Sequence, residues 1–236
     1  MTARLAPPAS EILHPITRDA RVVDCETAAG LGALNRPGVT MAIWRRSPPV
    51  CPARGSARRA AGALAQLRIL VRPADLRSAL TPLFAGAGLS GGEMPDLLVG
   101  DIEVLVSAFS GIAKCDLVDV RLERITDNAC SKFHRDNVDL RLLTTYRGAT
   151  TQWVAPAYAA QALREQKAYT GPLERLQVHD VAVFKGRSGD PEEGIVHRSP
   201  PIAGLGLVRW LLCLNKPTLV SPEPWSDGMR RSPASG

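Results

Sequence analysis

The clearest hydrophobic pattern in the chain lies between residues 95 and 112. Apolar side chains recur there at intervals of three or four residues, at Leu98, Ile102, Leu105, Phe109 and Ile112. This spacing places them on one face of a helix, and Pro95 followed by Asp96 suits a first helical turn. The pattern therefore predicts a helix that buries one face.

A different pattern begins after Cys115, where short apolar runs alternate with turn residues. Val, Leu, Ile and Thr dominate these runs, and Gly, Pro, Asp and Asn separate them. So many short runs within about a hundred residues are typical of antiparallel strands in a barrel or jelly roll. The predicted strands are LVDVRLERI (117–125), VDLRLLTTY (138–146), VAVF (181–184), GIVH (194–197) and LVRWLLCL (207–214).

The N-terminal half carries weaker patterns. The run VTMAIWRR (39–46) predicts a strand, because β-branched and aromatic residues favour extended backbone. Residues 47–59, which are rich in Pro, Ser and Arg, predict a loop. Residues 60–70 are predicted to form a helix.

These patterns divide the chain into four parts. Residues 1–20 and 216–236 are rich in Pro, Ser and Gly, which predicts an irregular N-terminus and a flexible tail. Between them we expect an α+β protein, with a mostly helical part at 21–115 packed against a β-domain at 116–215.

Composition narrows the class of protein. Apolar residues make up 45% of the chain and the mean hydropathy is −0.03. The first residues, MTARLAPPAS, lack the apolar stretch of a signal peptide, and the most apolar helix candidate (97–112) contains Asp101 and Glu103. We therefore expect a cytoplasmic protein without a membrane partner.

Charge and cysteine content exclude some function classes. The formal net charge is +6, but the basic residues are spread over the whole length, which favours a solvated surface over a nucleic-acid partner. The five cysteines form an odd, scattered set without a C-x-x-C pair. This argues against a disulfide framework and against a thiolate zinc finger.

Candidate metal ligands occur in FHRDNVDLRLLTTYRG (133–148). His134 and Asp136 are two residues apart, so an extended backbone points both side chains to the same face. A third ligand candidate is His197 in the strand-like run EGIVHRS. Two histidines and one carboxylate leave three adjacent positions free on an octahedral metal, as in non-haem Fe(II) oxygenases.

An arginine is predicted to point into the same cavity. If GIVHRS and GLVRWLLCL pair as antiparallel strands around Ala203, His197 and Arg209 lie opposite each other. Opposed residues have Cβ atoms roughly 5 Å apart on one face. A guanidinium at that place is suited to binding a carboxylate through two hydrogen bonds.

The order H-x-D, then a distant H, then R about a dozen residues later resembles the Fe(II)/2-oxoglutarate-dependent dioxygenases. This resemblance covers residues 117–215 and implies a double-stranded β-helix (jelly-roll, cupin-like) flanked by N-terminal helices. It implies that His134, Asp136 and His197 bind Fe(II) and that Arg209 anchors 2-oxoglutarate. Tyr146, in TTYRGATTQW, is implied as a second contact to this cosubstrate.

Most of the chain also resembles a bacterial family of unknown function, DUF1826. The phrases CSKFHRDNVDLRLLTTYRG, TQW, DVAVFKG and VHRSPP carry this resemblance. It implies no established activity, and it implies zinc-responsive gene neighbourhoods only as context.

The alternative function is therefore a non-catalytic zinc-binding or metal-homeostasis protein of cupin-like fold. The same three side chains bind zinc as well as iron. Cys130, four residues before His134, would be a soft fourth ligand that favours zinc. Its other interpretation is a small buried apolar side chain. The substrate of an oxygenase is left open by the sequence.

Overall fold

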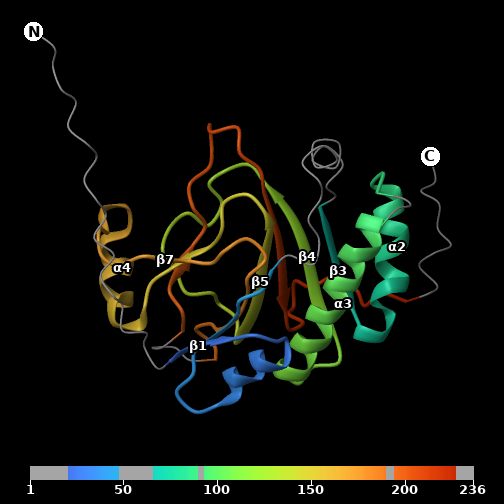
Figure 1. Cartoon of the computed structure of the whole chain (residues 1–236), viewed down its shortest axis with the longest axis horizontal. Coiled ribbons are helices and arrows are strands. Elements are labelled where there is room, and N and C mark those ends of the chain that lie inside the picture. Colours follow the sequence, from blue (N-terminus) through green and yellow to red (C-terminus); the bar gives the residue numbers. More distant parts are fainter. Residues whose placement is uncertain (1–20, 48–65, 90–92, 190–193, 227–236) are drawn as a thin grey trace, which may run out of the picture.

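The computed structural model describes residues 21–47, 66–89, 93–189 and 194–226 (Figure 1). Its strands form a large seven-stranded sheet, in the order β1-β2-β8-β5-β10-β4-β3, and a small three-stranded sheet, in the order β7-β6-β9. The strands of the large sheet are β1 (Val22–Cys25), β2 (Met41–Trp44), β3 (Leu67–Val71), β4 (Val118–Ile125), β5 (Leu140–Arg147), β8 (Val181–Lys185) and β10 (Arg209–Asn215). Those of the small sheet are β6 (Gln152–Trp153), β7 (Glu174–Arg175) and β9 (His197–Arg198).

The chain winds back and forth between the two sheets. After β5 it enters the small sheet as β6 and β7, returns as β8, crosses again as β9 and ends in the large sheet as β10. The inner faces of the sheets share one apolar cluster, which joins Leu143 and Leu211 of the large sheet to Trp153 of the small one. This topology is a double-stranded β-helix, so the predicted α+β jelly-roll class is confirmed.

The helices that precede β4 in the chain cover the outer face of the large sheet. Their apolar residues form a second cluster with outward-facing strand residues such as Leu142 and Leu212. In Figure 1 the two long helices, α2 and α3, lie together on one side of the molecule and α4 lies on the other. The helices are η1 (Ala29–Asn35), η2 (Pro73–Asp75), α2 (Leu76–Gly86), α3 (Glu93–Ala113), η3 (Pro156–Tyr158), α4 (Ala159–Glu165) and η4 (Gln166–Ala168).

The predictions for individual elements are largely confirmed. The helix predicted from Pro95 is α3, and Leu98, Ile102, Leu105 and Phe109 are all buried. Each predicted strand after Cys115 overlaps an observed one, although GIVH does so only at His197. The strand predicted at 39–46 is β2. No helix within the described ranges is long and apolar enough to cross a membrane.

The N-terminal part differs from the expectation in one respect. The helix predicted at 60–70 is wrong where it is described, because Leu67–Val71 forms β3, which pairs with β4. A short apolar run of this kind suits either a helix or a strand, and pairing with β4 makes it a strand. Because β1, β2 and β3 all join the large sheet, residue 115 does not divide the sheet into separate parts. Of the loop predicted at 47–59, residues 48–59 lie outside the described residues, and so do residues 1–20.

The predicted flexible tail is also partly wrong. Residues 216–226 lie along the large sheet, where Trp225 donates its backbone N–H to the carbonyl of Leu70 at 2.7 Å. The hydroxyl of Ser221 donates to Asp119 at 2.7 Å. These bonds and the packing of Trp225 on the outer core hold the segment in place. Residues 227–236 lie outside the described residues.

Candidate metal centre

Three side chains converge at one end of the space between the sheets. His134, Asp136 and His197 each offer a ligand atom, and these atoms lie within 4.8 Å of one another. The Nε2 atom of His134 is 3.5 Å from Oδ1 of Asp136, and that of His197 is 3.4 Å from Oδ2. The structure thus brings together the three residues that the sequence pattern selected.

Backbone pairing places the two histidines. His134 and His197 form an antiparallel bridge, in which each backbone N–H donates to the carbonyl of the other at 3.0 Å. Their rings therefore project side by side, with centroids 4.6 Å apart. Asp136 follows two residues after His134 and returns to the same face.

Hydrogen bonds fix which ring nitrogen of each histidine faces Asp136. Nδ1 of His134 lies 2.8 Å from the carbonyl oxygen of Lys132, and Nδ1 of His197 lies 3.3 Å from that of Ile195. Because a carbonyl only accepts, the proton of each neutral ring belongs on Nδ1. The lone pair on Nε2 then points towards Asp136, as metal-binding histidines require.

The two histidines differ in their electrostatic surroundings. Burial lowers the pKa of His197 to about 4, so this ring is neutral at pH 7 and available as a ligand. His134 is less buried, and its interaction with Asp136 raises its pKa. A metal ion at the site would have to displace a proton from His134 at mildly acidic pH.

Asp136 is buried and its two oxygens are in different situations. Oδ1 accepts from Nη1 of Arg141 at 2.8 Å, whereas Oδ2 is a buried atom with no hydrogen-bond partner among the described residues. Burial favours a higher pKa for Asp136, but His134, His197 and Arg141 outweigh it and lower the pKa. The group is therefore a carboxylate with one unused oxygen.

This donor set fits a divalent metal ion. Two neutral Nε2 atoms and one unpaired carboxylate oxygen face a common point, and an orphaned buried oxygen costs free energy unless something binds it. Further contacts hold these ligands in place, because Lys132 and Ile195 bind the histidine rings and Arg141 binds the carboxylate.

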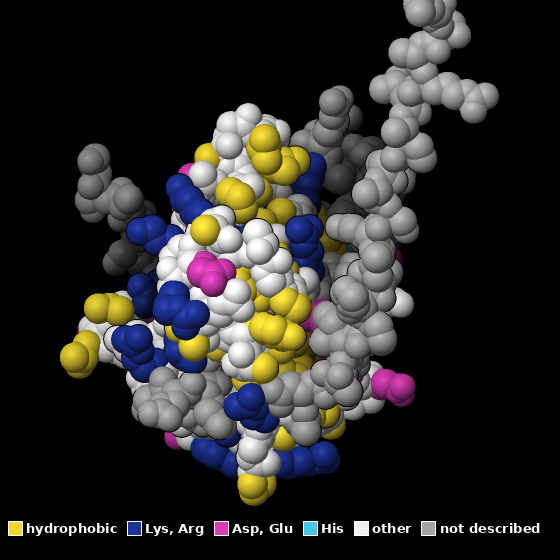
Figure 2. All heavy atoms as spheres, turned by 90° about the vertical axis from the view of Figure 1, so that its left-hand side faces the viewer, with side chains coloured by type: hydrophobic (Ala, Val, Ile, Leu, Met, Phe, Trp, Pro, Cys, Tyr) yellow, Lys and Arg dark blue, Asp and Glu magenta, His cyan; other side chains and the backbone are white. Residues whose placement is uncertain are grey.

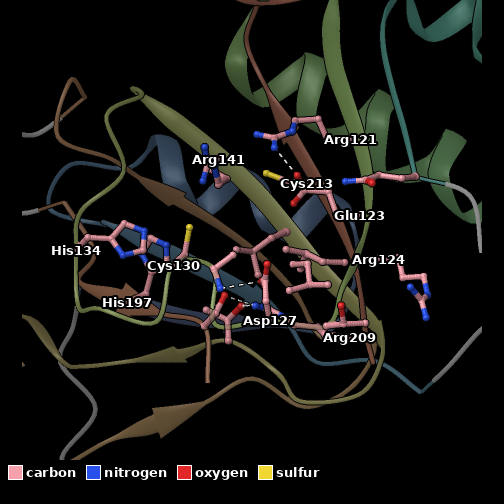
Figure 3. Close-up of a pocket in the computed structure, with 18 residues that line it drawn as sticks. Arg121, Glu123, Arg124, Asp127, Cys130, His134, Arg141, His197, Arg209 and Cys213 are labelled. Carbon is pink, nitrogen blue, oxygen red and sulfur yellow. Dashed lines mark hydrogen bonds and ion pairs between the residues drawn. The ribbon is translucent and has the colours of Figure 1, made fainter. Parts of the chain in front are cut away.

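The two histidines of the ligand group line a cavity of about 420 Å³ between the sheets (Figure 3). His134 and His197 line one side of it, and β4 contributes Arg121 and Glu123. The exposed Cys130 also lines the cavity, but its sulfur is not in the group of ligand atoms that lie within 4.8 Å.

Arg209 lines the same cavity and is only 1% exposed. Its Nη2 donates to the hydroxyl of Thr151 at 2.5 Å and its Nη1 donates to that of Ser199. Among the described residues, its Nε has no hydrogen-bond partner and no carboxylate forms an ion pair with the guanidinium. Burial lowers the pKa of Arg209 to about 10, so the side chain is still a cation at pH 7.

The predicted route by which Arg209 reaches the cavity is wrong. It assumed a hairpin of two paired strands, but β9 pairs with β6 in the small sheet while β10 pairs with β4 and β5 in the large one. The connection after His197 crosses between the sheets. Arg209 faces the cavity because the inner face of β10 looks across at the small sheet.

The structure does not bring Tyr146 to the cavity. Its side chain packs in the outer core, and its hydroxyl donates to Oδ2 of Asp101 at 2.7 Å. The reason is the alternation along β5, in which Leu143 faces inward and Tyr146, three residues later, faces outward. The contact to a cosubstrate that the resemblance implied for Tyr146 is therefore a wrong expectation.

Three other residues of the site escaped the sequence interpretation. Arg141 is a charged residue inside the apolar run VDLRLLTTY, which was a usable signal. Ser199 follows His197 by two residues and so returns to the same face. Thr151 stands three residues after Gly148, where the resemblance of TTYRGATTQW to a Gly-x-x-Thr turn includes a threonine, although no role was assigned to it.

Fold and site together define a double-stranded β-helix protein with two histidines and one carboxylate that could hold a metal ion. The chain belongs to the family described as "Protein of unknown function (DUF1826)", whose model matches residues 25–215. A comparison with curated proteins finds no match.

Solved structures with a similar fold include three dioxygenases or hydroxylases. The dioxygenase for auxin oxidation (DAO) in rice has 13% sequence identity, 88% of each chain covered and a TM-score of 0.46. For AtDAO1 from Arabidopsis thaliana, in a 2-oxoglutarate complex, these values are 10%, 67% of this chain, 65% of that chain and 0.41. A Pseudomonas putida prolyl-4-hydroxylase has 11% sequence identity, with 74% of this chain and 100% of that chain covered, and a TM-score of 0.32.

Proposed function

We propose that the protein is a non-haem Fe(II)/2-oxoglutarate-dependent oxygenase that hydroxylates a substrate. The observation that supports this proposal is that one cavity joins two features. The first is the ligand group His134, Asp136 and His197, and the second is Arg209, a buried cation without a carboxylate partner among the described residues. A dicarboxylic keto acid such as 2-oxoglutarate has a keto-acid end that could bind the metal and a far carboxylate that could pair with Arg209.

In this proposal the three ligands hold Fe(II), which supplies the oxidising chemistry once oxygen and cosubstrate are present. Arg209 binds the far carboxylate of 2-oxoglutarate through its guanidinium edge. Thr151 and Ser199 hold that guanidinium in one orientation through their hydroxyl groups. The two sheets shield the reacting atoms from bulk water.

The burial of Arg209 costs free energy. A buried guanidinium without a counter-charge is unfavourable, because two hydroxyl groups replace only part of its hydration. A carboxylate that enters the cavity restores this interaction in a medium of low dielectric constant, where the attraction is strong. The same cost gives the site a preference for anionic cosubstrates over neutral ones.

The test is an anaerobic titration of metal-free protein with Fe(II) and then 2-oxoglutarate. The expected result is the visible charge-transfer band that a chelated keto acid produces. His134→Ala and His197→Ala should lose the band together with iron binding. Arg209→Met should keep iron binding but need at least about tenfold more 2-oxoglutarate, since a charge-assisted bidentate contact is lost.

Two controls sharpen this test. 2-Oxobutyrate has the keto acid but no far carboxylate, so wild-type protein should prefer 2-oxoglutarate, and Arg209→Met should abolish most of that preference. Arg36→Met removes an exposed arginine far from the cavity lining and should leave both ligands unaffected. Equal binding of both keto acids by the wild-type protein would contradict the role of Arg209.

The zinc-binding alternative predicts a different outcome of the same experiment. Tight zinc binding with no charge-transfer band in the iron-loaded protein would favour a metal-holding function. Cys130 would then be tested as an added ligand by Cys130→Ser, which should weaken zinc binding only under this alternative.

A further inference from the structure

We propose that Arg141 is a positioning residue that keeps Asp136 a one-oxygen ligand, so that the metal keeps a place for an anionic cosubstrate. The inference rests on the proposed function for its cosubstrate part and on the ligand group alone for its metal part. It assigns a role to a residue that neither the sequence patterns nor the ligand group includes.

The contacts of Arg141 support this role. Its Nη1 lies 2.8 Å from Oδ1 of Asp136, and its Nε donates to Oδ1 of Asn215 at 2.9 Å. Asn215 is buried in the last position of β10, and Arg141 itself lies on β5, which pairs with β10 at this point. Two adjacent strands thus fix the guanidinium against one oxygen of the carboxylate.

The other oxygen of Asp136 has no such partner. Oδ2 is buried and without a hydrogen bond among the described residues, and it is the atom that lies 3.4 Å from Nε2 of His197. A carboxylate can bind a metal through one oxygen or through both. Because Oδ1 is paired with Arg141, only Oδ2 is available to bind a metal. Asp136 would then occupy one coordination position of the metal and not two.

The charge of Arg141 acts in the same direction. Two neutral histidines, one carboxylate and Arg141 sum to a net charge of zero, so a divalent ion at the site keeps its full positive charge towards a dianionic cosubstrate. Without Arg141 the ligand group carries one negative charge. Arg141 also lines the cavity, so its attraction reaches a bound anion directly.

This arrangement predicts opposite effects on metal and on cosubstrate. In Arg141→Met both oxygens of Asp136 become available and a competing cation is gone. We expect about tenfold tighter binding of Zn(II). This size matches the lower end of the losses that usually follow when a partner of a metal ligand is removed, but the sign is opposite because Arg141 is a cation that competes with the metal for Asp136. Per iron bound, we expect the variant to need at least about tenfold more 2-oxoglutarate for the charge-transfer band.

The matched control is Arg68→Met. Arg68 forms a similar pair with Asp119 on the same sheet, with Nη2 to Oδ2 at 2.7 Å and Nε to Oδ1 at 3.1 Å, but it does not line the cavity. Its loss should leave Zn(II) and 2-oxoglutarate binding within about threefold of wild type, because its carboxylate partner is not a ligand. Arg141→Lys keeps a cation beside Asp136 and should restore most of the wild-type behaviour.

A second variant covers the case in which Arg141→Met does not fold. Asn215→Asp offers Arg141 a competing carboxylate, so it should shift Zn(II) and 2-oxoglutarate binding in the same directions by smaller factors. Weaker Zn(II) binding in the folded Arg141→Met protein, or unchanged binding of both ligands, would overturn the proposal. If Arg141 only held Asp136 in place for the metal, Arg141→Met would bind Zn(II) more weakly than the wild-type protein.

The outcomes also separate this inference from the proposed function. If wild-type protein binds metal but gives no band with 2-oxoglutarate, the oxygenase proposal fails, while the Zn(II) comparison still decides the role of Arg141. If wild-type protein binds neither Fe(II) nor Zn(II), both proposals fail.

Discussion

Two buried arginines lie on opposite faces of the large sheet, and their partners differ. Arg46, on the outer side, is paired with Asp101, to which its Nη2 donates at 2.9 Å, and its Nε donates to the carbonyl of His179 at 2.8 Å. Tyr146 donates to the same carboxylate. Arg209, on the inner side, has only the hydroxyl groups of Thr151 and Ser199 as partners within the described part of the chain.

The difference separates a structural arginine from one that is available to a ligand. The outer group of Arg46, Asp101 and Tyr146 is internally neutralised, and it joins the segment that follows β2 to α3 and β5. The inner group lacks the carboxylate that would complete it. Removing a partner should therefore destabilise the outer group strongly, whereas the inner group should affect ligand binding more than folding.

The largest expected effect is that of Asp101→Ala. It leaves Arg46 buried without its counter-charge and Tyr146 without its acceptor, which should lower the free energy of unfolding by about 3–5 kcal/mol. Urea unfolding would measure this. Asp96→Ala, an exposed residue on the same helix, should cost about 0.5 kcal/mol. A loss below about 1 kcal/mol for Asp101→Ala would contradict the assigned structural role.

The next effect concerns pH in the metal-free protein. The pKa of His197 is about 4 in the folded state and 6.5 as the reference value, so its contribution to stability is present above pH 6.5 and lost as the pH falls to 4. This loss amounts to about 3 kcal/mol. The pKa of His134 is raised, so this residue affects stability at higher pH than His197 does. Its contribution to the free energy of unfolding is present below pH 6.5 and is lost as the pH rises.

His197→Gln checks this assignment, because it removes the titrating group but keeps a neutral polar side chain. Urea unfolding between pH 7 and pH 4 should show a smaller loss of stability in this variant than in the wild-type protein. The same pH dependence in both proteins would show that other groups cause it.

A somewhat smaller effect is expected when metal is added. Zn(II) at about 100 times its dissociation constant should raise the free energy of unfolding by about 2.7 kcal/mol, because it binds only the folded ligand group. Chelation should reverse the gain, and His134→Ala should show none. Thermal or urea unfolding with and without metal provides the measurement.

The smallest effect on stability is expected for Arg209→Met. The variant removes a buried cation that has no carboxylate partner among the described residues, so the free energy of unfolding should rise slightly, by less than about 1 kcal/mol, because the cost of burying the charge is removed. A loss of about 3 kcal/mol would mean that Arg209 is as structural as Arg46, and the contrast between the two faces would disappear.

Much of the fold could be predicted from the sequence because its elements have strong local patterns. The periodic apolar positions of α3 and the short apolar runs after Cys115 predict which residues are buried, and so which elements form. The segment at 67–71 was harder, because a short apolar run suits either a helix or a strand until a neighbour pairs with it, and β4 provided that neighbour. The segment at 216–226 is held by individual hydrogen bonds to residues that are distant in sequence, and no local pattern reveals such bonds.

For the candidate site, the sequence by itself determined the ligand types and the spacing of His134 and Asp136, since two residues of extended backbone return to one face. Only the tertiary structure decided that His197 joins them by a backbone bridge, that Arg209 arrives from the opposite sheet and that Tyr146 faces away. It alone decided that Arg141 takes one oxygen of Asp136 and leaves the other. The physical reason is that facing sheets bring together residues whose separation along the chain carries no information about distance.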